Sequence, residues 1–300
     1  MEEFKSGFVS LVGRTNVGKS TLINALTKEK VAIATSKPQT TRTAIRAILN
    51  DEKYQIIITD TPGIHKPKTK LGETMIDTAF TMTSEVDVVL FLIEATSENI
   101  GKGDRLILDK IIESKRPCIL IINKIDLIKR EKLLNLIDLY SKEYDFKAVI
   151  PVSAEKDKGT DIVVKEIEKI LPVGPKYYDE DEYTDQTMRE LASEIIREKA
   201  LKLLNDEVPH GIYVEVESFK ERKTTKGEDI IDIDAVINCL RESHKGIIIG
   251  KGGNLLKRIS TYARQDLEKM FDIKINLKVW VKVKEDWQDK DNIVNKFKLK

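Results

Sequence analysis

The chain has 300 residues, of which 41% are hydrophobic and 34% are charged, and its 51 basic residues nearly balance its 50 acidic ones. This length favours two globular domains with ordinary cores, and the balance of charge excludes nucleic-acid binding through overall net charge, so any such surface needs local segregation of charge. The two cysteines, Cys118 and Cys239, lie in separate apolar runs, which excludes a disulfide scaffold and a zinc site and predicts buried thiols in a cytoplasmic protein.

Residues 1–173 alternate between strand-like apolar runs and amphipathic stretches that favour helices. Several of the apolar runs are hydrophobic at consecutive positions, as expected for parallel strands that are buried on both faces. This alternation predicts an α/β domain with a doubly wound, mostly parallel sheet. The six expected strands are residues 8–12, 43–49, 55–59, 86–93, 118–123 and 148–153.

Residues 174–186 are predicted to form a linker, because a glycine and a proline are followed by five acidic residues within 179–185. Residues 187–300 then change pattern and are predicted to form a second, α+β domain. Its strands alternate polar and apolar residues, which favours a half-exposed antiparallel sheet. The expected order is helix, strand, strand, helix, helix, strand, and the segments with clear bounds are 187–204, 212–219, 230–240, 254–271 and 274–283.

The sequence GRTNVGKS, residues 13–20, follows the first expected strand and opens a helix, which is the context that a phosphate-binding loop requires. Its glycines allow the backbone to wrap a phosphate, so that the amides of the loop and of the helix amino terminus point at the anion. Lys19 is expected to reach the terminal phosphates and Ser20 to bind a magnesium ion. The expected nucleotide contacts in this region are Gly13, Asn16, Val17, Gly18, Lys19, Ser20 and Thr21.

A second motif, DTPG at residues 60–63, ends the expected strand at 55–59. A carboxylate at the carboxyl end of a neighbouring strand can hold magnesium through water, and a glycine amide can face the terminal phosphate with no side chain in the way. An ordinary Asp-Pro-Gly turn does not explain why the motif follows a buried strand at this distance from a phosphate loop. Asp60 is therefore expected at the metal and Gly63 at the phosphate.

The base is expected to be guanine, because NKID at residues 123–126 ends another buried strand. The Asp126 carboxylate can accept hydrogen bonds from N1 and the exocyclic amino group of guanine. Adenine has no matching pair of donors and would leave the carboxylate unpaired, at a cost of about 1–3 kcal/mol. A last motif, VSAEKDKGT, closes the sixth expected strand. The expected base contacts are Asn123, Lys124, Asp126, Ser153 and the Ala154 amide.

These four motifs, in this order on successive strand ends, resemble those of the Ras-like GTPases among the phosphate-loop proteins. The resemblance implies hydrolysis of GTP to GDP and phosphate with Mg²⁺, a first switch at residues 35–43 and a second at 64–72. It also implies that a threonine of the first switch completes the magnesium shell; Thr41 is the expected ligand, and Thr40 is the alternative. Magnesium is thus expected at Ser20, Thr41 and Asp60, and the catalytic groups are expected at Lys19, Gly63 and Thr41.

Two positions bear on the rate of hydrolysis. The glutamine that orients water after DxxG in many small GTPases is missing, since the position is Ile64, and this predicts slow intrinsic hydrolysis. Asn16 resembles the asparagine that potassium-stimulated GTPases use to hold a monovalent cation, which could stand in for an arginine finger. The alternative for Asn16 is a side chain that only stabilises the loop.

A second glycine-rich loop, GKGG at residues 250–253, lies between an apolar run and a long helix. A G-x-x-G loop lets a nucleic-acid backbone approach closely, although a plain turn between helices is the alternative. From His244 to Lys284 there are ten Lys and Arg against three Asp and Glu, and this local net charge of +7 favours phosphate. Trp280 is expected to pack rather than to stack on bases. The expected RNA contacts are Ile249, Gly250, Lys251, Gly252, Gly253, Lys257, Arg258 and Arg264.

This loop and its element order resemble the type II KH domain, and nearly the whole chain resembles the Era family of GTPases. The resemblance is carried by QTTR at 39–42, DTPGIH at 60–65, VPHGIYVEV at 208–216 and RESHKGIIIGKGG at 241–253. It implies a monomer that binds 16S ribosomal RNA near its 3′ end, assists assembly of the 30S subunit and associates peripherally with the bacterial inner membrane. It also implies that GTP binding and hydrolysis switch the KH domain.

Two other functions stay open at this point. One is that of a related GTPase that acts on transfer RNA modification or on the large ribosomal subunit, which would lack the GKGG loop. The other is that of an RNA-binding regulator with a degenerate switch and without significant turnover. Such a regulator would not need Lys19, Ser20, Asp60 and Asp126, all of which are intact here.

Overall fold

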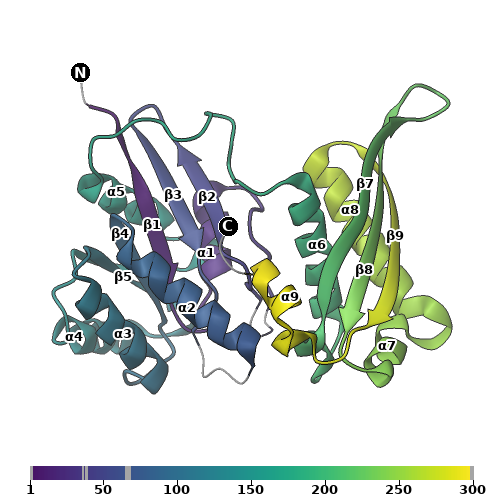
Figure 1. Cartoon of the computed structure of the whole chain (residues 1–300). Coiled ribbons are helices and arrows are strands. Elements are labelled where there is room, and N and C mark those ends of the chain that lie inside the picture. Colours follow the sequence, from purple (N-terminus) through teal and green to yellow (C-terminus); the bar gives the residue numbers. More distant parts are fainter. Residues whose placement is uncertain (1–2, 36, 38–39, 65–68, 298–300) are drawn as a thin grey trace. The chain divides into compact units, whose positions relative to one another are not determined.

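The computed structural model describes residues 3–35, 37, 40–64 and 69–297, and contacts between Cα atoms divide the chain into two compact units (Figure 1). Unit 1 holds Met1–Ala34, Thr41–Asp185 and Asn295–Lys300, and unit 2 holds Thr35–Thr40 and Gln186–Val294. The short segment Thr35–Thr40, in the predicted first switch, is thus grouped with unit 2, although its neighbours in the sequence belong to unit 1.

Unit 1 is built on a six-stranded sheet in the order β2-β3-β1-β4-β5-β6. Neighbouring strands are parallel except for β2 and β3, which are antiparallel. The prediction of an α/β domain with a mostly parallel sheet is therefore confirmed. The strands are β1 (Lys5–Val12), β2 (Ile45–Asn50), β3 (Tyr54–Asp60), β4 (Val88–Glu94), β5 (Cys118–Asn123) and β6 (Ala148–Pro151).

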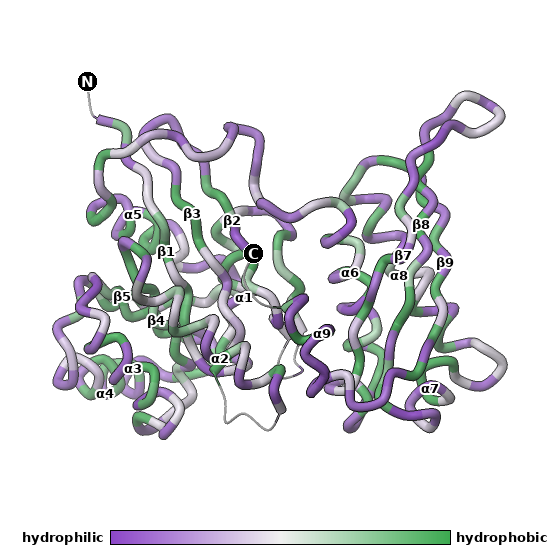
Figure 2. The backbone as a smooth tube through the Cα atoms, viewed as in Figure 1, coloured by the Kyte–Doolittle hydropathy of each residue, from purple (hydrophilic) through white to green (hydrophobic). Residues whose placement is uncertain are grey.

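Helices cover both faces of this sheet, and each face has its own hydrophobic core. The hydrophobic residues of β4 are consecutive because successive side chains face opposite cores. Leu90 belongs to one core and the next residue, Phe91, to the other. Figure 2 shows hydrophobic residues gathered along these strands and hydrophilic ones along the linker. Helices α1 (Lys19–Thr27) and α5 (Thr160–Ile170) contribute to the first core, and α2 (Lys70–Ser84), α3 (Lys102–Ser114) and α4 (Arg130–Ser141) to the second.

The segment predicted as a linker is held on unit 1 by a buried glutamine of β3. Gln55 is fully buried, and its side-chain oxygen accepts hydrogen bonds from the amides of Tyr177 and Tyr178 at 2.7 and 3.1 Å. Its amide nitrogen donates to the Asn50 side chain at 2.7 Å and to the Tyr178 carbonyl at 2.9 Å. One side chain therefore satisfies three backbone groups of the linker, so the segment is anchored to the start of β3.

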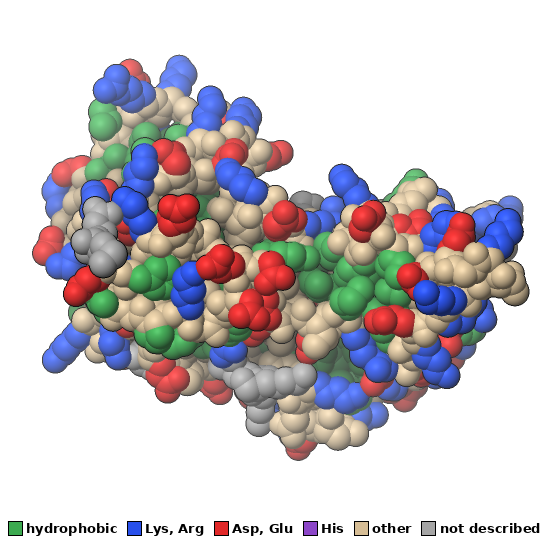
Figure 3. All heavy atoms as spheres, turned by 90° about the horizontal axis from the view of Figure 1, so that it is seen from above, with side chains coloured by type: hydrophobic (Ala, Val, Ile, Leu, Met, Phe, Trp, Pro, Cys, Tyr) green, Lys and Arg blue, Asp and Glu red, His purple; other side chains and the backbone are tan. Residues whose placement is uncertain are grey.

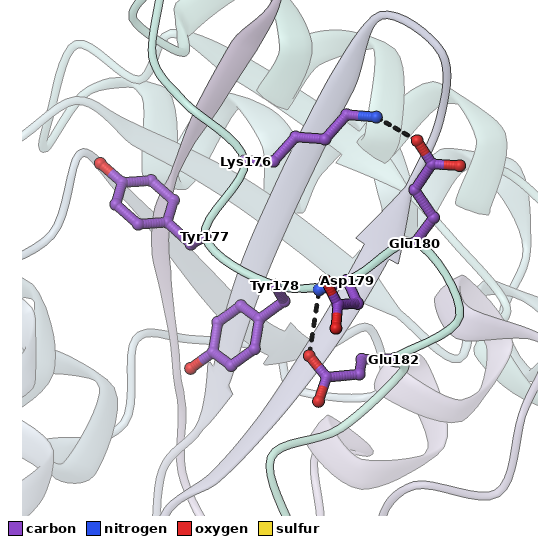
Figure 4. A pocket seen from close by; sticks show the side chains of 6 residues that line it. All are labelled: Lys176, Tyr177, Tyr178, Asp179, Glu180 and Glu182. Carbon is purple, nitrogen blue, oxygen red and sulfur yellow. Dashed lines mark hydrogen bonds and ion pairs between the residues drawn. The ribbon is translucent and has the colours of Figure 1, made fainter.

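The acidic part of the linker surrounds an open pocket of about 460 Å³ lined by residues 176–180 and by Glu182 (Figure 4). Lys176 pairs with Glu180, and the Asp179 amide donates to Glu182 at 3.1 Å. The rings of Tyr177 and Tyr178 point away from the Lys176–Glu180 pair. The negative charge of this segment is thus partly neutralised within the segment itself.

Unit 2 has a three-stranded sheet in the order β7-β8-β9. Strands β7 and β8 are antiparallel, as expected, but β8 and β9 are parallel. The expectation of a wholly antiparallel sheet is wrong for β9, because the chain returns through two helices before β9 begins, and such a crossover makes neighbouring strands parallel. The expected order is confirmed in α6 (Met188–Leu203), β7 (Tyr213–Lys223), β8 (Asp229–Cys239), α7 (Glu242–Ile249), α8 (Asn254–Phe271) and β9 (Lys274–Val283), which a short α9 (Asp291–Val294) follows.

The core of unit 2 lies between one face of this sheet and the helices α6 and α8. Ile195 of α6, Ile233 of β8 and Leu267 of α8 are each at most 2% exposed. Alternate residues of β9 are exposed, and Trp280 falls on that face with 46% of its surface exposed. The expectation that Trp280 packs into the core is therefore wrong. The other tryptophan, Trp287, is fully buried.

Replacing Gln55 with leucine is expected to lower the free energy of unfolding by about 2–4 kcal/mol. Leucine has a similar volume, but it leaves the backbone amides of Tyr177 and Tyr178 without their acceptor, and each such loss costs about 1–3 kcal/mol. Urea unfolding followed by circular dichroism measures the change. Glu52→Gln, at an exposed position of the preceding turn, is the control and should change the value by less than about 0.5 kcal/mol. Equal effects of the two substitutions would contradict the proposed anchor.

Candidate functional site

The phosphate loop runs from the end of β1 into α1. Gly18 has a φ of 101°, in the left-handed region that favours glycine, and it directly precedes Lys19, the first residue of α1. A Cβ on Gly13 would lie 2.5 Å from the carbonyl oxygen of Leu92, so only glycine fits between the loop and β4. The first turn of α1, which includes the half-buried Thr21, carries no acidic residue. The positive end of this helix is therefore left to an anion.

Lys19 and Asp60 place opposite charges in the buried floor of the site. Lys19 is 7% exposed, and its Nζ donates to the carbonyls of Gly13 and Arg14, each at 3.0 Å. Burial lowers the pKa of Lys19 to about 8, although Asp60 acts in the opposite direction. Burial likewise raises the pKa of Asp60, against the effect of Lys19. A phosphate near Lys19 and a cation near Asp60 would each stabilise the charged form.

The three oxygen-bearing side chains expected to hold magnesium lie together. The hydroxyls of Ser20 and Thr41 donate to Oδ2 of Asp60 at 2.9 and 3.1 Å, and they lie 3.0 Å from each other. Asp60 is fully buried, and among the residues that the structure describes its Oδ1 has no hydrogen-bond partner. Because Mg²⁺ prefers carboxylate, hydroxyl and water oxygens, this donor set fits the ion.

The two candidate threonines of the first switch point to different places. Thr40 lies apart from the oxygen cluster, since its hydroxyl donates to the Lys37 carbonyl at 2.7 Å and lies 2.8 Å from the hydroxyl of Thr35. Its own carbonyl accepts a hydrogen bond from the buried Arg197. The geometry therefore favours Thr41 over Thr40. Residues 36, 38 and 39 of the first switch and 65–68 of the second lie outside the described residues.

The base motif at the end of β5 also holds the phosphate loop. The Asn123 amide donates to the Val17 carbonyl at 2.8 Å, and its oxygen accepts from the Ala154 amide at 3.0 Å. Lys124 donates to the Asn16 carbonyl at 2.9 Å. The Ala154 amide, which was expected at the guanine edge, is thus engaged by Asn123 in this structure. These bonds fix the distance between the base and phosphate halves of the site.

Asp126 and Ser153 meet as expected. The Ser153 hydroxyl donates to Oδ1 of Asp126 at 2.6 Å, and Lys156 lies 3.3 Å from the other oxygen. The hydrogen bond from Ser153 is the main reason why the pKa of Asp126 is lowered, and it outweighs burial. An ionised carboxylate accepts hydrogen bonds only, which suits the two donors of guanine. Lys156 was missed, although it lies three residues beyond Ser153 in the same VSAEKDKGT motif.

The DTPG turn lies directly against the phosphate loop. The Ile64 amide donates to the Gly13 carbonyl at 3.3 Å, and Ile64 forms an isolated parallel bridge with Arg14. A Cβ on Gly63 would lie 2.8 Å from Cγ2 of Thr15, so glycine is required for this approach. Ile64 is 3% exposed and apolar, so its side chain brings no group that orients water.

The second glycine-rich loop joins α7, which ends at the half-buried Ile249, to α8 in unit 2. Gly250, Gly252 and Gly253 have φ values of 72°, 60° and 76°, all in the region that favours glycine. A Cβ on Gly252 or Gly253 would meet nothing within 4 Å, whereas one on Gly250 would lie 2.7 Å from Cβ of Leu255. The loop therefore packs through Gly250 and leaves its other two glycines open to an approaching backbone.

The basic residues expected at RNA phosphates differ in their partners. Lys251, Lys257 and Arg258 are exposed, whereas Arg264 forms an ion pair with Glu268 at 2.6 Å. Figure 3 shows side chains of both charge signs interspersed over the face that it draws. We therefore expect the three exposed residues to contribute more to phosphate binding than Arg264.

Two families of known proteins match parts of the chain. Residues 8–124 match the family described as "50S ribosome-binding GTPase", and residues 207–288 match the family described as "KH domain". The first match spans the phosphate loop, the DTPG turn and the start of NKID, and the second spans the GKGG loop.

Individual relatives are similar over nearly the whole chain. The GTPase Era of Ruminiclostridium cellulolyticum is 52% identical over 291 residues, which cover 97% of this chain and 96% of the relative. That of Clostridioides difficile is 51% identical, with 98% of each chain covered. The crystal structure of Era in complex with MgGDPNP and nucleotides 1506–1542 of 16S ribosomal RNA matches at 40% identity with a TM-score of 0.93, over 98% of both chains. A variant of Aquifex aeolicus Era bound to GDP·AlF4⁻ matches equally well, over 98% of this chain and 99% of that one.

Asp126→Asn is expected to weaken GTP binding by roughly 10- to 100-fold and to improve binding of xanthosine triphosphate. The substitution replaces an acceptor by an amide, which no longer accepts from both guanine donors but can donate to the extra carbonyl of xanthine. Isothermal titration calorimetry with both nucleotides measures the change. Asp157→Asn, in the VSAEKDKGT motif after β6 and paired with Lys28, is the control and should leave both affinities within about twofold. Unchanged GTP affinity in Asp126→Asn would place the base elsewhere.

Proposed function

The chain belongs to the Era family of GTPases, and on that basis we propose that it binds 16S ribosomal RNA and acts in assembly of the small (30S) ribosomal subunit. It is a GTP hydrolase with a KH domain. The proposal is carried by the presence of two sites in one chain, a guanine-nucleotide site at the strand ends of unit 1 and an open glycine loop in unit 2. A similar solved structure holds a GTP analogue with magnesium and a segment of 16S ribosomal RNA.

The alternatives fit these observations less well. A GTPase for transfer RNA modification or for the large subunit would not need the KH domain at residues 207–288. An RNA-binding regulator without turnover would not need Ser20, Thr41 and Asp60 to converge on one point. We propose a GTPase domain at residues 1–173, a linker at 174–186 and a type II KH domain at 187–300.

In the proposed reaction, water attacks the γ-phosphorus of GTP and the bond from that phosphorus to the bridging oxygen breaks, which gives GDP and inorganic phosphate. Lys19 and the amides at the start of α1 stabilise the charge on the phosphates, and the Gly63 amide faces the γ-phosphate. Ser20, Thr41 and Asp60 would hold Mg²⁺, which would neutralise negative charge on the phosphates. Because Ile64 brings no polar group to orient the water, we expect slow intrinsic turnover.

Cytoplasmic location, a monomeric state and peripheral association with the inner membrane rest on the family resemblance and stay predictions. Within the described ranges, no helix is long and apolar enough to cross a membrane.

We also propose that Asn16 holds a K⁺ ion beside the phosphates. Asn16 has a φ of 66°, and Lys124 fixes its carbonyl, so its position in the loop is well determined. A cation there would offset charge that develops on the phosphates in the transition state, as an arginine finger does in other GTPases.

The potassium proposal predicts that kcat is about tenfold higher in K⁺ than in Na⁺ at equal ionic strength. Phosphate release measured at saturating GTP and Mg²⁺ gives the ratio. Asn16→Ala should bring the ratio to about one, while Thr27→Ala, at the far end of α1, should preserve it. Equal turnover of the unsubstituted chain in both salts would end the proposal.

The proposed coupling of nucleotide to RNA runs through the first switch. Arg197 of α6, which is buried and paired with Glu194 at 2.7 Å, donates to the carbonyl of Thr40. The next residue in the chain is Thr41, whose hydroxyl contacts Asp60. A change at the magnesium site would therefore move a backbone that an arginine of unit 2 holds. By linkage, RNA must change GTP affinity by the same factor as GTP changes RNA affinity.

This coupling predicts that a 16S RNA 3′-end fragment binds with affinities that differ by about 5- to 100-fold between the GDP and GTP-analogue states. Arg197→Lys should bring that factor toward one, because a lysine at this position cannot reproduce the bonds to both Thr40 and Glu194. Lys202→Ala, on the same helix, is the control. Gly252→Asp should weaken RNA binding in both states and leave GTP affinity unchanged. Identical RNA affinities in the two states would sink the coupling.

A further inference from the structure

Arg14 is the second residue of the phosphate loop, but its side chain reaches away from the loop into helix α3. Its Nε donates to Oδ1 of Asp104 at 2.8 Å, and its Nη2 donates to the hydroxyl of Ser97, which follows β4, at 3.2 Å. Asp104 lies in the first turn of α3. The phosphate loop is therefore tied to an element that carries none of the nucleotide motifs.

The start of α3 is shaped to receive this arginine. Asp104 is fully buried, and burial raises its pKa while Arg14 acts in the opposite direction. A Cβ on Gly103 would lie 2.8 Å from Cδ and 3.2 Å from Cγ of Arg14, so the absence of a side chain there makes room for the arginine stem. A buried carboxylate needs a partner, and Arg14 supplies both the charge and a directed N–H.

The backbone of Arg14 contacts both Lys19 and the residue that follows the DTPG turn. Its carbonyl accepts from Nζ of Lys19 at 3.0 Å. Its backbone also forms the bridge with Ile64, the residue directly after the DTPG turn. A displacement of Arg14 would therefore change both the place of the lysine and the place of the Gly63 amide.

We propose that Arg14 is a positioning residue for GTP hydrolysis, through which helix α3 holds the phosphate loop in register with the DTPG turn. Asp104 and Gly103 are the parts of α3 that fix it. The inference rests on the proposed roles of Lys19 and Gly63. It assigns a function in catalysis to side chains that contact each other rather than the groups proposed to bind nucleotide and metal.

An arginine in this loop invites a second interpretation, in which its guanidinium contacts the transferred phosphate directly. The structure argues against that interpretation, because the guanidinium is committed to the buried Asp104. If the guanidinium of Arg14 left Asp104, the buried carboxylate of Asp104 would have no charged partner.

The test is single-turnover and steady-state GTP hydrolysis by the full chain with Arg14→Gln, Asp104→Asn and the double variant. Each single substitution should lower kcat about tenfold or more, because small misplacements of reacting groups have large effects on rate. The kcat of the double variant should be no lower than that of the slower single variant, since both substitutions break the same contact.

In each variant, affinity for GDP should stay within about threefold of the unsubstituted chain. Affinity for a GTP analogue should fall further, since only the γ-phosphate needs the Gly63 amide.

Two further variants keep the proposal open to refutation. Gly103→Ala retains both charges, but its methyl group would displace the aliphatic part of Arg14. Like the Arg14 and Asp104 variants, it should lower kcat. Arg105→Gln, at the next position of α3 and paired with Glu143 on the surface at 2.7 Å, should change nothing. The proposal is overturned if Asp104→Asn keeps kcat within twofold, or if affinities for GDP and the analogue fall equally together with the melting temperature. It is also overturned if Arg14→Gln and Asp104→Asn each lower kcat and their effects add in the double variant, which would indicate that the two residues act independently. Hydrolysis by the unsubstituted chain in the same assay separates these outcomes from a failure of the GTPase function itself.

Discussion

The GTPase unit depends on two opposite buried charges, Lys19 at the start of α1 and Asp60 at the carboxyl end of β3. A buried charge is costly unless it is paired and hydrogen-bonded. Two carbonyls of the phosphate loop satisfy Lys19, and the hydroxyls of Ser20 and Thr41 satisfy one oxygen of Asp60. Lys19 and Asp60, which these contacts stabilise, are thus the same groups that would interact with a phosphate and a magnesium ion.

Contacts from outside the motif hold the phosphate loop around these charges. Asn123 and Lys124 bind its carbonyls from the base side, and Asp104 holds Arg14 from α3. The loop is therefore fixed at several points by strand ends and by one helix start. A rigid loop suits phosphoryl transfer, in which the protein mainly positions groups and neutralises charge. It also means that base recognition and phosphate binding share hydrogen bonds at Asn123.

Much of the fold could be predicted, because burial on both faces of a parallel sheet gives each strand a continuous apolar run, as in β4 and β5. The direction of β9 could not, since alternation within a strand is the same whether its neighbour is parallel or antiparallel. The anchoring of the linker was also missed. Gln55 lies near the start of β3, and no local pattern indicates that its amide meets residues more than 120 positions away.

By itself, the sequence determined the chemistry of each loop, because glycines with positive φ, strand ends and helix starts are set by neighbouring residues in the chain. From these follow the phosphate loop, the guanine motif and the open GKGG loop. Only the tertiary structure decided which of Thr40 and Thr41 meets Asp60, that Arg264 is paired with Glu268, and that Arg14 is bound by Asp104. Threonines at adjacent positions are chemically equal, and their difference arises only from where the folded backbone directs each hydroxyl. The contact between Arg14 and Asp104 spans 90 positions, so it exists only once the sheet and α3 have packed.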